Sequence, residues 1–172
     1  ISGAAIVGLP YLIRTSLGLS ARLYGAAESA MGLAALLGGL AAGALAARLP
    51  FRRLNRLVTV VGGCCLLGGG ALLLPVGAMG QYGALVLVFC VGQAMACTFS
   101  IFAVSAIQQR TPDHMTGKVM ACVSTISMCA QPLGQMLYGL WFDASPGWAV
   151  LSASGAAIFA LGVCSRKLFE KW

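Results

Sequence analysis

The chain has 172 residues, of which 59% are hydrophobic and 9% are charged, and its formal net charge is +7. Soluble domains carry about 25% charged residues, so this composition excludes an ordinary water-soluble globular protein. The positive charge does not indicate a nucleic-acid partner either, because the basic residues stand at the ends of apolar segments, without a basic patch of interleaved aromatic residues.

Long segments of the chain contain no ionisable Asp, Glu, Lys, Arg or His. One lies between Arg56 and Arg110, and others cover residues 29–47, 119–142 and 144–165. Each is near or above the ~18 apolar residues that indicate a membrane-spanning helix. A transmembrane barrel needs strands of alternating polarity, and no such alternation occurs. The sequence therefore predicts an all-α membrane protein.

Residues 57–109 form a run too long for one span, and "PVGAMGQYG" at 75–83 supplies the proline and glycines of a turn. Short connections lead us to expect that helices adjacent in sequence are antiparallel neighbours in space. We expect a single transmembrane domain over residues 1–172, with six helices at about 1–15, 22–48, 55–75, 81–109, 116–142 and 147–167.

The first predicted helix is short, because its roughly 13 apolar residues cover ~20 Å of a bilayer core that is ~30 Å thick. The chain also opens with isoleucine and carries no signal peptide. We therefore expect an N-terminally truncated fragment of a longer chain.

Small residues are frequent within the predicted spans. Gly39 and Gly43, four residues apart, are expected to let two helices approach closely. The seven cysteines all lie in spans and show neither a Cys-x-x-Cys pair nor a Cys/His ligand spacing. They are interpreted as packing residues, and no metal or other cofactor is indicated.

Basic residues predict the orientation, because cytoplasmic loops are enriched in Lys and Arg. Nine of the eleven lie in the second and fourth connections or after the last helix, and two lie in the first connection. We therefore expect the even-numbered loops and the C-terminus to be cytoplasmic.

The polar stretch "QQRTPDHMTGKVMA" begins at residue 108, between two apolar runs. Its "TGK" differs from a phosphate-binding loop, because Pro112 and Val119 stand where that motif needs glycine and Ser or Thr. The stretch is interpreted as a cytoplasmic turn. Pro112 and Asp113 favour a helix start, with Thr111 as its cap.

An enzyme is not expected. Embedded catalysis needs acids, histidines or nucleophiles grouped at one depth, whereas the four acids are scattered at Glu28, Asp113, Asp143 and Glu170. His114 beside Asp113 lacks a nucleophile motif or a second acid, and it is interpreted as a solvated loop residue.

The segment "AIQQRTPDHMTGKVMA", followed by "AQPLGQMLYGLWFD", resembles the linker and eleventh helix of major facilitator superfamily transporters. The branch it most resembles is that of bacterial exporters similar to the enterobactin exporter. The linker of that branch reads Arg, then Pro, then Gly-Arg-Val, and the matching residues here are Arg110, Pro112, Gly117, Lys118 and Val119.

A second segment, "GALAARLPFRR", resembles the cytoplasmic loop motif Gly-x-x-x-Asp-Arg-x-Gly-Arg-Arg of the superfamily. The ten motif positions fall on residues 43–52, and Arg53 is the last residue of the segment. Gly43, Arg48 and Arg52 match. Three positions depart from the motif: Ala47 replaces the acid, Pro50 the second glycine and Phe51 the first of the closing basic pair. An acid-based latch at this loop is therefore not expected.

The resemblance implies half of a major facilitator fold: two inverted three-helix repeats that face a missing N-terminal six-helix half of a twelve-helix transporter. It implies alternating-access transport of a small solute, with proton-coupled export as the common mechanism, and conformational roles for the basic loops. The alternative is a channel-like or structural six-helix bundle that assembles as a homo-oligomer through glycine-rich faces.

Polar side chains align on two predicted helices, and polar groups in hydrocarbon usually face a cavity or another helix. The functional interpretation is a hydrated solute pathway, and the simpler one is hydrogen bonding between helices. The candidate pathway residues are Gln93 and Ser100 on the fourth helix and Ser127, Gln131 and Gln135 on the fifth.

Glu28 is the one acid predicted within a span, so it is a candidate for proton coupling. The alternative is structural: Arg14 and Arg22 are predicted at the same membrane face, where either cation could hold the carboxylate in an ion pair.

Overall fold

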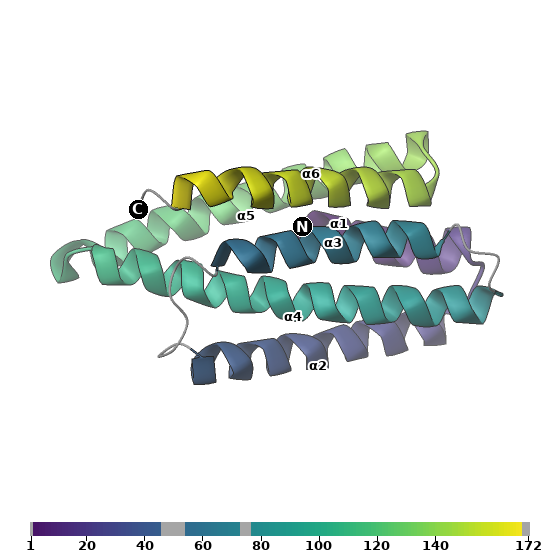
Figure 1. Ribbon diagram of the computed structural model, residues 1–172, viewed down its shortest axis with the longest axis horizontal. Coiled ribbons are helices and arrows are strands. Elements are labelled where there is room, and N and C mark those ends of the chain that lie inside the picture. Colours follow the sequence, from purple (N-terminus) through teal and green to yellow (C-terminus); the bar gives the residue numbers. More distant parts are fainter. Residues whose placement is uncertain (1, 46–53, 73–76, 170–172) are drawn as a thin grey trace.

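The computed structural model describes residues 2–45, 54–72 and 77–169, with side chains for residues 6–44, 57–72 and 77–164. These residues form an all-α bundle, shown in Figure 1. The six helices are α1 (Ser2–Pro10), α2 (Ala21–Leu45), α3 (Leu54–Ala71), α4 (Ala78–Arg110), α5 (Asp113–Ala144) and α6 (Gly147–Phe169), and α1 continues as a π-helical turn, η1 (Tyr11–Ser16). The prediction of six helices is confirmed.

Three of these helices are long and apolar enough to cross a bilayer. They are α2 over Ala21–Ala44, the whole of α4, and α6 over Gly147–Cys164, while α3 contributes a shorter apolar stretch, Leu57–Ala71. Large apolar side chains on their outer faces are exposed, for example Leu37 and Leu40 of α2. Exposed leucines of this kind fit hydrocarbon rather than water. The chain is therefore an integral membrane protein in contact with lipid.

Helices α3 and α6 pack along one another through glycines. A Cβ placed on Gly62 would lie 2.5 Å from the backbone nitrogen of Phe159, which no side chain tolerates. Such contact lets two backbones approach and maximises dispersion between helices in lipid. Four contacts share one antiparallel register: Gly62 with Phe159, Gly69 with Ser152, Gly155 with Leu66, and Gly162 with Thr59.

Helices α2 and α4 form a second close pair. Gly38 lies against the backbone of Ala94, and the single proton of the buried Thr98 hydroxyl is shared between the Gly38 carbonyl oxygen at 3.0 Å and the Ala94 carbonyl oxygen of its own helix at 2.8 Å. Nearer the start of both helices, the Tyr82 hydroxyl donates to the Leu23 carbonyl oxygen at 2.8 Å. These two hydrogen bonds fix the register of α4 along α2.

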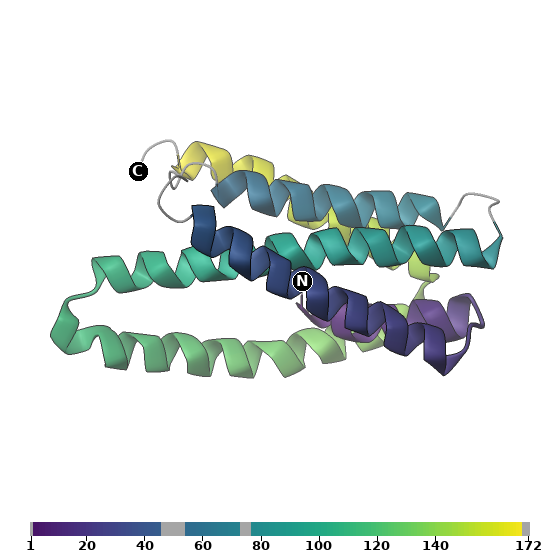
Figure 2. The same ribbon diagram turned by 90° about the horizontal axis from the view of Figure 1, so that it is seen from below.

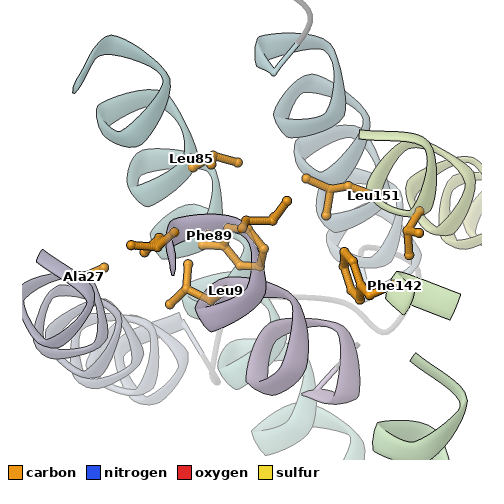
Figure 3. Packing of buried hydrophobic residues seen from close by; sticks show 9 residues of the cluster. Leu9, Ala27, Leu85, Phe89, Phe142 and Leu151 are labelled. Atoms are coloured by element: carbon orange, nitrogen blue, oxygen red, sulfur yellow. The ribbon is translucent and has the colours of Figure 1, made fainter. Parts of the chain in front are cut away.

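The main buried cluster lies toward the end of the bundle where α2 begins. Figure 3 shows Leu9 of α1 beside Phe89 of α4, and Phe142 of α5 near Leu151 of α6. The Tyr11 and Phe142 rings also pack together, with centroids 5.0 Å apart. This cluster joins α1, α4, α5 and α6 at one level.

The expectation that sequence neighbours pack together is wrong for most pairs. The extensive contacts in the described residues join α3 with α6, α2 with α4, α3 with α4 and α1 with α5, so only α3 and α4 are both adjacent and closely packed. Figure 2 shows the ribbons of α4 and α5 well apart beyond their short connection. A short loop fixes direction, whereas the small-residue faces decide which helices touch.

Two local predictions are also wrong. Gly39 and Gly43 are not the site of close approach: Gly39 makes ordinary contacts, Gly43 meets nothing within 4 Å, and the neighbouring Gly38 touches α4 instead. The cap predicted at Thr111 does not form, because its hydroxyl bonds back to the Ile107 carbonyl oxygen at 2.7 Å. The residue before α5 is Pro112, which offers no side-chain cap.

We expect Gly38→Ala to destabilise the protein by about 1–3 kcal/mol, because the added methyl group meets the rigid Ala94 backbone. Gly43→Ala on the same helix is the matched control, since open space surrounds it and alanine favours helix by about 0.5–1 kcal/mol. In detergent, the melting temperature of Gly38→Ala should lie below that of wild type, and the melting temperature of Gly43→Ala should lie above it. An unchanged melting temperature for Gly38→Ala would show that α2 and α4 separate easily.

Candidate functional site

A cavity of about 420 Å³ lies between α1, α2, α4 and α5. This volume is within the roughly 300–1,000 Å³ typical of small-molecule sites. Four helices contribute to its wall, which is apolar except for a carboxylate, a phenol and two amides. The lining residues are Ile6, Leu9, Tyr24, Glu28, Met31, Gly32, Ala35, Gln93 and Gln131.

The acidic group of the cavity is Glu28, an exposed side chain on α2. The Tyr24 phenol lies one turn earlier on the same helix and also lines the cavity, so it is the polar group next to Glu28 on the α2 side of the wall. Among the described residues, neither Arg14 nor Arg22 forms an ion pair with this carboxylate. Arg22 lies six positions before Glu28, which places it about 120° away around the helix. The ion pair considered from the sequence is thus absent from the described part of the chain.

The two amides come from helices that do not pack on each other. Gln93 is half-buried on α4 and Gln131 is exposed on α5, and the cavity wall includes both. An amide offers a donor and an acceptor without charge, so this pair can bind polar groups of many solutes. The structure therefore brings together three candidates that the sequence places on three different helices.

The hydrogen bonds between α2 and α4 give the relative depth of these groups. Leu23 is level with Tyr82, and Glu28 lies ~7.5 Å further along α2 from that level, at about 1.5 Å per residue. Gln93 lies ~16 Å along α4 from the same level. Glu28 thus stands nearer the end of the bundle where α2 begins, and Gln93 stands deeper.

The other candidate pathway residues lie outside the cavity wall. Ser100 is exposed two turns beyond Gln93, and Gln135 is half-buried one turn beyond Gln131. The Ser127 hydroxyl is already bonded, donating to the Val123 carbonyl oxygen of its own helix at 2.8 Å. These three residues are not brought together with Gln93 and Gln131 around the cavity.

The candidate loop residues that the structure describes lie away from the cavity, toward the opposite end of the bundle. Arg48, Arg52 and Arg53 fall outside the described residues. The remaining candidates are exposed: Gly43 near the end of α2, Arg110 at the end of α4, Pro112 before α5, and Gly117 and Lys118 in the early turns of α5.

The sequence analysis missed the α2 side of the wall. Tyr24, Gly32 and Ala35 lie four before, four after and seven after Glu28, and Met31 lies three after it. This spacing follows one face of a helix. A helical-wheel projection of α2 would have identified all four residues on the face that contains Glu28.

No protein-family model, curated protein or solved structure matches this chain.

A cysteine at Gln131 should react with a charged, membrane-impermeant thiol reagent at least roughly tenfold faster than one at Leu133, because thiolate forms in water and not in hydrocarbon. Leu133 is the matched control, since it is also exposed but lies on another face of α5. The comparison needs the full-length protein with its native cysteines replaced by alanine. Equal rates would contradict a hydrated cavity at this position.

Proposed function

We propose that this protein is part of a secondary transporter that moves a small solute across the bacterial cytoplasmic membrane by alternating access, with proton-coupled export as its mechanism. The observation that carries the proposal is the shared cavity of Glu28, Gln93 and Gln131. A mostly apolar cavity with a few convergent polar groups is the usual form of a small-molecule site. Its place within a bundle of apolar helices favours a solute that crosses the membrane.

The packing pattern supports two inverted three-helix repeats. Exchanging α1 with α4, α2 with α5, and α3 with α6 converts the α2–α4 contact into the α1–α5 contact and leaves the α3–α6 contact unchanged. The α3–α4 contact is the exception, because its counterpart between α1 and α6 is slight. Inverted repeats of this kind place solute sites at the interface of discontinuous or paired helices. In this arrangement α3 and α6 support the helix pairs that line the cavity.

The exposure of α5 supports a missing partner half. Between residues 121 and 133 every side chain except Val123 is exposed, including polar Ser124, Thr125 and Gln131. Polar side chains on a helix in lipid are unfavourable unless protein or water covers them. We propose that an N-terminal six-helix half faces this side and closes the cavity.

Glu28 is the proposed proton carrier. It is the acid among the described residues that line the cavity, its polar neighbour on α2 is Tyr24, and it forms no ion pair in the described part of the chain. A carboxylate without a fixed cation can exchange its proton when the cavity opens to alternate sides of the membrane. The alternative, a channel-like or structural homo-oligomer, predicts no dependence of solute movement on this acid.

Coupling is tested in inverted vesicles that contain the full-length protein and a preformed pH gradient. We expect some members of a panel of charged and neutral solutes to dissipate the gradient, and Glu28→Gln to abolish this response because glutamine carries no exchangeable acid proton. Asp143→Asn, at an exposed acid outside the cavity, should respond as wild type. Solute or ion flux that ignores the gradient would favour the channel.

The proposed orientation places residues 48–56 and 110–118 in the cytoplasm, because they hold much of the positive charge. In a cysteine-free background, a cysteine at position 118 should resist an impermeant reagent added to intact cells, whereas one at position 79 should react. The exposed Met79 and Lys118 are suitable sites. The opposite labelling pattern would invert the topology.

A further inference from the structure

We propose that the cavity binds amphipathic organic monocations, with the Glu28 carboxylate as the anionic partner and the apolar wall as the seat for the rest of the molecule. This inference rests on the proposed transport function and specifies its solute class.

The charge of the cavity is opposite to that of the chain. The protein carries a net charge of +7, yet the described residues that line the cavity include Glu28 and no Lys, Arg or His. Glu28 is exposed on α2, and a carboxylate without a counter-charge attracts a cation most strongly where apolar walls concentrate its field. It also repels anions, so the local charge selects for positive solutes.

The wall around this carboxylate suits a cation with a hydrophobic body. Tyr24 presents an aromatic ring one turn from Glu28, and such a ring attracts a cation over its face. Gly32 lies one turn beyond Glu28 on the same face of α2 and meets no atom within 4 Å where a Cβ would stand, so space opens beside the acid. Leu9, Met31 and Ala35 supply the apolar contact surface.

The remaining polar groups favour a single positive charge. Gln93 and Gln131 are neutral, so their oxygens can accept hydrogen bonds but cannot balance a second full charge. A dication would leave one charge unpaired in an apolar cavity, which is costly. A neutral solute would leave the Glu28 carboxylate partly desolvated without a compensating partner.

The test is equilibrium binding of radiolabelled tetraphenylphosphonium to the full-length protein in nanodiscs at fixed pH. Tetraphenylborate, of nearly the same size and shape but opposite charge, is the matched competitor. We expect unlabelled tetraphenylphosphonium to displace the probe and tetraphenylborate to fail. Glu28→Gln should weaken binding at least tenfold, because the wall then has no charge, while Asp143→Asn leaves binding unchanged.

A second variant keeps the test valid if Glu28→Gln does not fold, as judged by size-exclusion chromatography. Gly32→Leu fills the space beside the carboxylate and should also weaken binding at least tenfold. Gly70→Leu, at an exposed glycine of α3 with equally open surroundings, is its control. Displacement by tetraphenylborate, or unchanged binding in folded Glu28→Gln, would overturn the monocation assignment.

The inference and the transport proposal fail in different ways. If the probe does not bind but a neutral or anionic solute still dissipates the pH gradient, transport stands and the monocation class is wrong. If the probe binds with the expected charge selectivity but no solute moves in the vesicles, the binding site stands and the transport function is wrong.

Discussion

The close approach of helix backbones at glycine determines the rest of this structure. Lipid chains are as apolar as leucine, so no hydrophobic force draws two helices together in a membrane, and their association depends on contact area. The absence of a side chain at Gly62 and Gly155 lets the backbones of α3 and α6 touch along one register, and Gly38 does the same for α2 and α4. Helices α1 and α5 form the third pair, at the level of Phe142.

This arrangement explains why the cavity lies where it does. The α3–α6 pair is closely packed, whereas α2 and α5 face each other across the cavity without extensive contact in the described residues. Polar side chains that would be costly against lipid or in a dry interface can be accommodated where helices leave a cavity between them. Glu28, Gln93 and Gln131 all lie on the wall of that cavity.

The sequence predicted helices well because charge-free runs and turn residues are local signals. It did not predict the pairing, since a helix rich in glycine and alanine has several faces that look alike. Gly38 and Gly39 differ by 100° around α2, and the backbone of Ala94 alone decides which one is covered. The site was likewise identified as separate polar residues, and only the pairing shows that Gln93 and Glu28 share a wall while Ser100 and Ser127 do not.

The single acid of the cavity links the proposed solute class to the proposed coupling. Among the described residues of the wall, α1, α4 and α5 contribute no acidic or basic group, and on α2 the titratable groups are Glu28 and Tyr24. One carboxylate cannot be neutralised by a proton and paired with an organic cation at the same time. A bound proton removes the negative charge that the cation needs, and a bound cation opposes protonation of the carboxylate. Binding of the proton and binding of the cation are therefore mutually exclusive at this site. If the cavity can switch its opening between the two sides of the membrane only when Glu28 is neutralised, each switch would carry either a proton or a monocation. Exchange of protons for monocations would then need no second ionisable residue.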